Sequence, residues 1–214
     1  MDAQKLNRLA ELGPATVYEA SGREGLIDLP LIQVVPQSRV AGPARTVLCG
    51  QGDNVMVHAA IEHIQPGEVV VLAMPLSEPV ALIGDLLATQ MKVHGAIGVL
   101  TNSSVRDVET LQQLGLPVWT EFIRVRGATK KNYGRLNVPV TIGGAIVYPG
   151  DIIVMDADGA VTVKRHRLDE VLKKAEARAA KEDDMRRRYL AGERSYDSRG
   201  WREGVEENRR LRGE

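Results

Sequence analysis

The alternation of apolar runs with helix-spaced segments between residues 69 and 119 most constrains the fold. Val69-Val70-Val71-Leu72 is a continuous apolar run, typical of a strand buried on both faces. A helical stretch opens at Asp85, a short apolar strand follows at 97–100, a second helix follows Asp107, and Val118-Trp119 indicates another strand. Strands that alternate with helices predict parallel βαβ units with right-handed crossovers. The fold class that we expect is therefore α/β.

The pattern changes after Val138, where short β-branched strands are separated by glycine-containing turns, which predicts an antiparallel meander. Residues 168 to about 190 have the spacing of a long, highly charged amphipathic helix. We therefore expect one α/β domain over residues 1–167. Residues 168–214 are expected to form a C-terminal helix and tail that pack on a neighbouring subunit, because the apolar side of this helix needs a surface to cover.

The composition argues against several classes of function. Lys plus Arg and Asp plus Glu both number 28 in 214 residues, and the resulting formal charge of zero gives no support for binding nucleic acid or an anionic membrane. No apolar run approaches the roughly 20 residues of a membrane span. Cys49 is the single cysteine, so we interpret it as a small buried residue in a reducing compartment. With no apolar signal core in residues 1–5, a cytoplasmic location is expected.

Asp85 and the pair Arg106-Asp107 are the candidate site. Both lie at helix starts, and the helix and strand between them return the chain to its starting end, so their side chains are expected to meet. Carboxylate oxygens suit a hard divalent cation, and a planar guanidinium suits a substrate carboxylate. The free backbone N–H groups of Leu86 and Leu87 can also receive an anion.

Other interpretations of these and neighbouring residues stay open. Arg106-Asp107 could be a surface ion pair of small energetic weight. Lys130-Lys131 could supply a Schiff-base lysine, although the surrounding polar residues favour exposure to solvent. Ser103-Ser104 lacks a Gly-x-Ser-x-Gly elbow, which disfavours a serine nucleophile. The histidines lack the spacing of zinc ligands; they are His58, His63, His94 and His166.

Gly84-Asp85-Leu86-Leu87-Ala88-Thr89 with Arg106-Asp107 resembles the signature of class II pyruvate aldolases. These enzymes act on 4-hydroxy-4-methyl-2-oxoglutarate and 4-carboxy-4-hydroxy-2-oxoadipate, and they share a fold with the regulator of ribonuclease activity A. The similarity covers about residues 6 to 194. It implies a swivelling β/β/α domain with a protruding C-terminal helix, assembled as a homotrimer or homohexamer. Further matching segments are Ala15 to Ala20, Gly52 to Asn54, Arg126 to Lys130, Pro149 to Asp151, Asp156 to Gly159 and Glu176 to Glu182.

The resemblance also implies a role for each site residue. Asp107 would be the direct protein ligand of Mg²⁺ or Mn²⁺, and Asp85 would hold metal-bound water. Arg106 would bind the carboxylate and keto oxygen of the pyruvyl group. Glu182 would reach in from the neighbouring subunit and hold further metal-bound water. The substrate-binding segment beside Arg106 would be Gly84, Asp85, Leu86 and Leu87.

The activity that the resemblance implies is metal-dependent cleavage of a 4-hydroxy-2-oxo acid to pyruvate and a second carbonyl compound. Oxaloacetate decarboxylation is expected as a side activity. The alternative is a non-catalytic regulator of ribonuclease activity that acts by protein–protein interaction, and the long helix with Glu182 favours the enzyme. This chain departs from the family pattern in having Asn102-Ser103-Ser104 before Val105-Arg106-Asp107, which is expected to lie beside the pocket and to affect substrate choice.

Overall fold

The computed structural model describes residues 2–213, and the chain divides into two compact units. The first unit runs to Ala175 and the second begins at Glu176. The division falls inside helix α5 (Leu168–Leu190), because Leu168, Val171 and Ala175 are buried in the core of the first unit. The packing of residues 168–214 on a neighbouring subunit stays a prediction.

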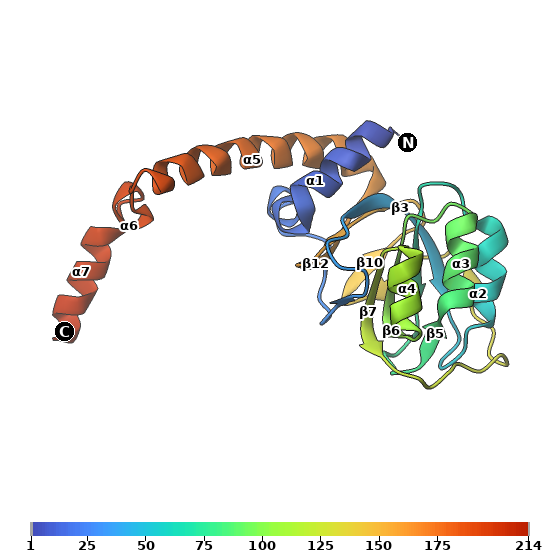
Figure 1. The fold of residues 1–214 in the computed structure, drawn as a ribbon. Coiled ribbons are helices and arrows are strands. Elements are labelled where there is room, and N and C mark those ends of the chain that lie inside the picture. Colours follow the sequence, from blue (N-terminus) through green and yellow to red (C-terminus); the bar gives the residue numbers. More distant parts are fainter. Residues whose placement is uncertain (1, 214) are drawn as a thin grey trace. The chain divides into compact units, whose positions relative to one another are not determined.

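The first unit is built on one extended mixed sheet (Figure 1). Within residues 2–213, its strands follow the order β1-β12-β11-β3-β4-β6-β7-β2, with β5 paired to β6 and β8 paired to β3, and β9 pairs β10 in a two-stranded sheet of its own. The strands are β1 (Leu26–Ile27), β2 (Ile32–Gln33), β3 (Val40–Leu48), β4 (Val69–Ala73), β5 (Ala81–Ile83), β6 (Gly98–Val105), β7 (Val118–Ile123), β8 (Arg135–Leu136), β9 (Val140–Ile142), β10 (Ala145–Val147), β11 (Ile152–Asp156) and β12 (Gly159–Val163).

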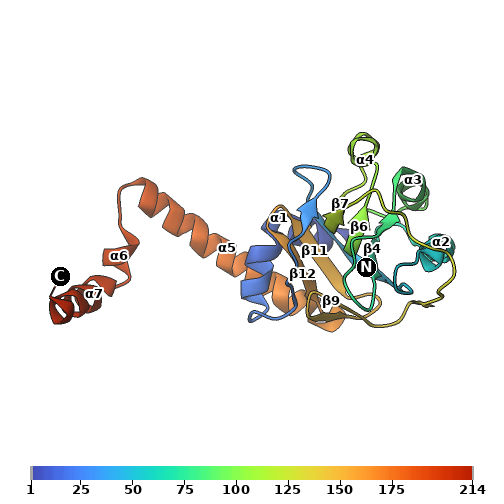
Figure 2. The ribbon, with the colours of Figure 1, turned by 90° about the horizontal axis from the view of Figure 1, so that it is seen from below.

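Strands β3, β4, β6 and β7 pair in parallel, as the alternation of strand and helix predicted. Helices α2 (Val55–Ala60), α3 (Asp85–Val93) and α4 (Val108–Leu114) cover one face of this parallel part (Figures 1 and 2). Val70 and Leu72 of β4 point into the cluster under these helices, with Met91 of α3 and Leu111 of α4. All these side chains are almost fully buried, so the hydrophobic effect holds the helices on the sheet.

The alternate residues of β4 face the opposite side of the sheet. Val69 and Val71 pack there with Ile142 of β9 and Ile153 of β11, which gives the second β layer of a β/β/α arrangement. β9–β10 and β11–β12 are antiparallel hairpins, as the turn signals predicted. Helix α1 (Ala3–Ala20), kinked at Gly13, packs against β11 and β12. The predicted α/β fold class is thereby confirmed.

Strand β6 is longer than the sequence suggested. We expected it to end at residue 100, but it continues through polar residues to Val105. Asn102 accepts the Met74 N–H at 2.9 Å and donates to the Met74 carbonyl at 3.0 Å, while Ser103 donates to the Val80 carbonyl. These bonds satisfy buried polar groups. Asn102 and Ser103 therefore support the fold, whereas Ser104 Oγ is buried without a hydrogen-bond partner among the described residues. Ser104 pairs in the sheet with Ala81, a residue that lines the pocket beside Arg106, and the effect of this segment on substrate choice stays a prediction.

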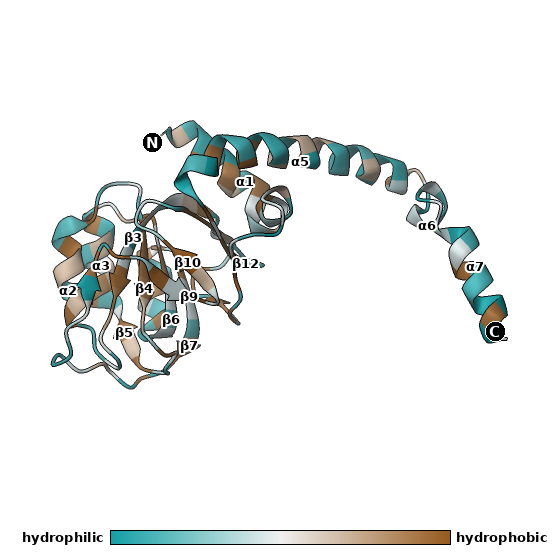
Figure 3. Cartoon of the chain, turned by 180° about the vertical axis from the view of Figure 1, so that it is seen from behind, coloured by the Kyte–Doolittle hydropathy of each residue, from teal (hydrophilic) through white to brown (hydrophobic). Residues whose placement is uncertain are grey.

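The second unit is helical. It contains the later part of α5, a short helix α6 (Ser195–Ser198) and α7 (Trp201–Arg212). Hydrophilic residues dominate these helices, whereas the strands of the first unit are largely hydrophobic (Figure 3). Among the residues that the structure describes, no helix combines the length and apolar character needed to cross a membrane.

Candidate active site

The structure brings Asp85, Arg106 and Asp107 together, as the βαβ spacing predicted. Asp85 is the first residue of α3, and Arg106-Asp107 connect the end of β6 to α4. Asp107 Oδ2 accepts a hydrogen bond from the Asp85 backbone N–H at 3.2 Å and lies 3.6 Å from Arg106 Nε. The side chains of Arg106 and Asp107 are 51% and 38% exposed, so the cluster remains accessible to a ligand.

Gly84 makes this approach possible. A Cβ atom at position 84 would overlap Asp107 Oδ2 and come within 3.2 Å of Arg106 Cγ and Nε. The Gly84 backbone is extended, with φ −135°, so it is the contact and not the backbone angle that calls for glycine. The cradle for the Asp107 carboxylate is thus formed by the main chain immediately before α3.

Asp107 itself has a left-handed backbone, with φ 60° and ψ 40°. For a residue other than glycine this conformation is strained, although Asp and Asn tolerate it better than most. Strain of this kind persists where the surrounding structure holds it, which is common at functional sites. Here the strained turn aims the carboxylate back at the start of α3.

The start of α3 offers hydrogen-bond donors to an anion. The Ala88 N–H makes the first α-helical bond, to the Gly84 carbonyl at 3.1 Å, so the N–H groups of Leu86 and Leu87 precede the bonded part of the helix. Unpaired N–H groups and the positive end of the helix dipole favour a carboxylate or phosphate. The structure therefore places Leu86 and Leu87 where the sequence predicted an anion-binding segment.

The residues at this cluster fit a hard divalent cation better than a soft one. Their donors are the carboxylate oxygens of Asp85 and Asp107, the ligands that Mg²⁺ and Mn²⁺ prefer. Among the described residues no three His, Cys, Asp or Glu side chains of one chain are grouped to hold a metal. Mg²⁺ usually keeps several waters and takes only one or two protein carboxylates, so this sparse donor set still suits it.

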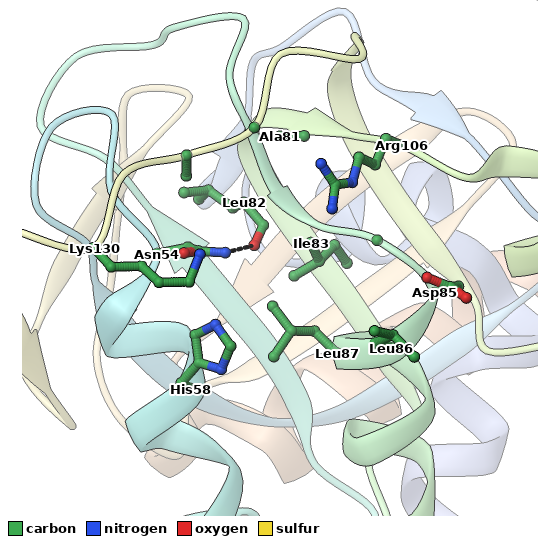
Figure 4. Close-up of a pocket in the computed structure, with 13 residues that line it drawn as sticks. Asn54, His58, Ala81, Leu82, Ile83, Asp85, Leu86, Leu87, Arg106 and Lys130 are labelled. Atoms are coloured by element: carbon green, nitrogen blue, oxygen red, sulfur yellow. Dashed lines mark hydrogen bonds between the residues drawn. The ribbon is translucent and has the colours of Figure 1, made fainter.

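A pocket of about 240 Å³ lies beside the cluster (Figure 4). Arg106 lines one side of it, and Asn54, His58 and Lys130 lie on the opposite side. A second, more open groove of about 680 Å³ is lined by Asp107 and by the loop that follows β7. Asp85 and Arg106 line both cavities, so they stand at the boundary between them.

Three residues that line the pocket were not assigned to this site from the sequence. Asn54 is the N-cap of α2, His58 lies in its last turn, and Lys130 belongs to the loop after β7. Lys130 is exposed, as we expected, but it also lines the pocket. The available signal was the resemblance of Gly52 to Asn54 and Arg126 to Lys130 to the aldolase family, which carried no chemical role by itself.

Asp53 holds this loop against α2. Its buried carboxylate accepts hydrogen bonds from the Thr129 hydroxyl at 2.7 Å, the Asn132 N–H at 3.0 Å and the Val55 N–H at 2.8 Å, and a further one from the Lys131 N–H. Burial alone would raise the pKa of Asp53, but these bonds outweigh it and lower the pKa to about 2. Asp53 is therefore ionised at neutral pH and fixes the backbone on both sides of Lys130.

The other candidates lie apart from this cluster. Cys49 is 1% exposed, and burial raises the pKa of its thiol to about 12, so it is the buried small residue that we predicted. Ser103 is buried within β6 and is no accessible nucleophile. Glu182 belongs to the second unit, where it pairs with Arg178 at 2.8 Å. Its role in a neighbouring subunit's site stays a prediction.

Comparison with known proteins identifies the family to which this chain belongs. Residues 14–162 match the RraA-like family described as Aldolase/RraA. The chain belongs to the RraA-like family. A curated relative from Halalkalibacterium halodurans, named "Putative 4-hydroxy-4-methyl-2-oxoglutarate aldolase", is 33% identical over 153 residues, which is 72% of each chain. The resemblance found in the sequence is thereby confirmed.

Solved structures of other proteins share the fold. A crystal structure of an uncharacterized protein from Pseudomonas syringae matches with a TM-score of 0.83 at 24% identity, covering 93% of this chain and 94% of that one. Streptomyces coelicolor RraAS2, described as an unusual member of the RNase ES inhibitor RraA protein family, matches with a TM-score of 0.76 at 25% identity. It covers 87% of this chain and 97% of its own. The family thus includes proteins named for aldolase activity and for ribonuclease inhibition.

Proposed function

We propose that this RraA-like protein is a divalent-metal-dependent aldolase. It would cleave a 4-hydroxy-2-oxo acid, such as 4-hydroxy-4-methyl-2-oxoglutarate or 4-carboxy-4-hydroxy-2-oxoadipate, to pyruvate and a second carbonyl compound. The observation that supports this most is the meeting of Asp85, Arg106 and Asp107 at the start of α3, beside a pocket of small-metabolite size. The name of the relative at 33% identity supports the same activity.

Arg106 and the α3 amides would bind the pyruvyl end of the substrate. The guanidinium donates hydrogen bonds to the C1 carboxylate and the C2 keto oxygen, and the Leu86 and Leu87 N–H groups receive the same carboxylate. When the C3–C4 bond breaks, its electron pair moves toward C3 and onto the keto oxygen, giving the enolate of pyruvate. Arg106 is positioned to stabilise the negative charge that develops there.

Asp85 would direct the proton transfers that accompany cleavage. Loss of the C4 hydroxyl proton must accompany cleavage, because C4 becomes the carbonyl carbon of the second product. Asp85 lies at the boundary of the two cavities, where its carboxylate can orient a water that takes this proton and returns one to C3. A divalent cation held by Asp107 would act as a Lewis acid that favours the enolate. The same enolate arises from oxaloacetate, so decarboxylation is proposed as a side activity.

The oligomer is part of the proposal. The groove beside Asp107 is flanked by Ile123 and Val125, and Val125 is 91% exposed. A neighbouring subunit packed on this groove would remove both side chains from water. We propose a homotrimer or homohexamer in which Glu182 of a neighbouring subunit completes the site through metal-bound water.

A second candidate is supported by the fold comparison with RraAS2, which is described as belonging to a family of RNase ES inhibitors. In that case the chain would bind a protein partner and turn over nothing. The two candidates differ in one measurable property, the production of pyruvate.

The deciding experiment is pyruvate release in a coupled lactate dehydrogenase assay. Metal-stripped protein is supplied with oxaloacetate or with each 4-hydroxy-2-oxo acid, with EDTA, Mg²⁺ or Mn²⁺. We expect turnover that EDTA abolishes and the added metal restores. Turnover that survives EDTA and is inactivated by borohydride would indicate a lysine Schiff base instead. Absence of metal-restored turnover on every substrate would overturn the aldolase proposal and favour the protein-binding alternative.

A further inference from the structure

The neighbour of β6 on one side consists of two separate strands. β4 pairs in parallel with the first half of β6, and β5 pairs in parallel with its last two residues. Between these strands the chain leaves the sheet for residues 74–80 and returns at Ala81. β5 then leads directly into Gly84 and Asp85. The point at which the chain returns to β6 therefore decides where the start of α3 meets Asp107.

The main-chain pairing of β5 defines this point poorly. The strand is three residues long, and its register on β6 shifts between Ala81 and Ile83. A slip of one residue along a strand is about 3.3 Å. The hydrogen bond from the Asp85 N–H to Asp107 Oδ2 is 3.2 Å long, so a much smaller displacement of β5 would break it. The position of β5 therefore depends on contacts outside its own ladder.

The Ser103 side chain supplies such a contact. It is fully buried and donates to the Val80 carbonyl, the last one before β5, with the Glu78 carbonyl also at 3.2 Å. The Val80 carbonyl accepts the Ser104 N–H as well, at 3.1 Å, so β6 holds it through both main chain and side chain. Ser103 is itself fixed from β7, because the Thr120 hydroxyl donates to its carbonyl at 2.8 Å. The return point of the chain is thus tied to the interior of the sheet.

We infer that Ser103 is a positioning residue for the contact between Asp85 and Asp107, an inference that rests on the proposed aldolase function. Ser103 is buried and does not line the pocket, so it acts through the chain that it holds. Its bond to the Val80 carbonyl fixes β5, and β5 sets the distance from the start of α3 to the Asp107 carboxylate. Arg106 belongs to the segment that continues β6, so its place depends less on this bond. Loss of the hydroxyl should therefore disturb proton transfer more than binding of the pyruvyl carboxylate.

Three variants separate this role from a contribution to stability alone. Ser103→Ala removes the hydroxyl that holds the Val80 carbonyl. Ser104→Ala is the matched control, because the Ser104 hydroxyl is also buried in β6 but has no hydrogen-bond partner within residues 2–213. Thr46→Val is the control for stability, because the buried Thr46 hydroxyl donates to the Val138 carbonyl at 2.6 Å. Thr46 lies on β3, which contributes no residue to either cavity of the site.

The first measurement is the steady-state rate of pyruvate release from oxaloacetate and 4-hydroxy-4-methyl-2-oxoglutarate at saturating Mg²⁺. We expect Ser103→Ala to lower kcat about 10-fold and to change KM less than about 2-fold, because a small displacement of reacting groups mainly slows the chemical step. Thr46→Val should lower the melting temperature about as much as Ser103→Ala does and keep the wild-type kcat. Ser104→Ala should keep both. A wild-type kcat in Ser103→Ala, or an equal loss in either control, would overturn the positioning role.

Hydrogen exchange of backbone amides, followed by NMR, is a second readout that needs no turnover. The Arg106 N–H donates to the Ile83 carbonyl at 3.2 Å, so its exchange reports whether β5 stays in place on β6. This amide should exchange about 5-fold faster in Ser103→Ala, the effect of losing one ordinary hydrogen bond, and at the wild-type rate in both controls. If wild-type protein releases no pyruvate, the proposed function fails and the exchange rate alone decides the positioning role. An unchanged rate in Ser103→Ala contradicts that role.

Discussion

Gly84 shows how one residue can control the geometry of the site without contributing any chemistry. The Asp107 carboxylate occupies the space that a Cβ at position 84 would need, while the Gly84 backbone is compatible with any residue. Gly84→Ala should therefore displace the carboxylate and leave the fold in place. We expect kcat/KM to fall about 100-fold, since a misplacement of about 1 Å costs that much in many enzymes. The half-exposed Asp107 side chain can rotate outward, so the melting temperature should change by less than about 4 °C.

Gly127→Ala is the matched control for this prediction. A Cβ at position 127 would lie 3.1 Å from Arg106 Nη1, at the flexible end of a long side chain. Arg106 can move by a few tenths of an ångström, so the loss in kcat/KM should be much smaller than in Gly84→Ala. Steady-state kinetics and thermal melting of both variants check this order. Equal kinetic losses in the two variants would show that the Gly84 cradle is not what positions Asp107.

At the scale of the structural elements, the Asp53 carboxylate holds the loop that carries Lys130 in place. Asp53→Asn replaces an oxygen that accepts several N–H groups by an amide that can accept fewer of them. We expect this variant to lose about 2 kcal/mol of stability at neutral pH, in the range for charge-assisted hydrogen bonds. The measurement is the urea midpoint of unfolding. Lys131→Met, which keeps every Asp53 hydrogen bond, is the control.

The same carboxylate predicts a pH dependence with a definite sign. The pKa of Asp53 is lowered in the folded protein from 3.8 to about 2, so its ionised form stabilises the fold at every pH above its usual pKa. That contribution is lost as the pH falls from 3.8 toward 2. The stability difference between wild-type protein and Asp53→Asn should therefore shrink over this interval. A difference that stays constant on acidification would argue against an ionised Asp53 in the folded state.

Local patterns account for the elements that the sequence predicted well. The run at β4 and the helix starts at Asp85 and Asp107 are set by nearby apolar spacing, and the meeting of the two starts follows from βαβ topology. The continuation of β6 through Asn102-Ser103-Ser104 could not be predicted, because the Asn102 and Ser103 side chains are satisfied by residues 74 to 80 on another segment. Lys130 was not assigned to the pocket for the same reason, because the sequence-distant Asp53 holds the loop that carries it.

At the scale of the whole molecule, the proposed role of Glu182 depends on the assembly of subunits. Glu182 lies in the second compact unit, whereas Asp85, Arg106 and Asp107 lie in the first. The groove beside Asp107 includes the exposed apolar side chains of Ile123 and Val125, which a neighbouring subunit could cover. If Glu182 completes the site of a neighbour, each active site consists of residues from two chains. A mixed oligomer of subunits that lack Asp107 and subunits that lack Glu182 can then contain some complete active sites.

We therefore expect complementation between Asp107→Ala and Glu182→Ala. Each variant alone should be strongly impaired, with the Glu182→Ala oligomer intact by light scattering. After co-refolding at equal amounts, sites that combine an intact Asp107 with a neighbour's intact Glu182 should form at random, giving about a quarter of the wild-type sites in a cyclic oligomer. Pyruvate release should rise to about that fraction of the wild-type rate, well above the mean of the two variants. If Glu182 served its own chain, every mixed site would lack one of the two carboxylates, and the rate would stay at that mean. Mixing Asp107→Ala with Asp85→Ala is the control, because both residues lie at the same chain's site and no combination restores it.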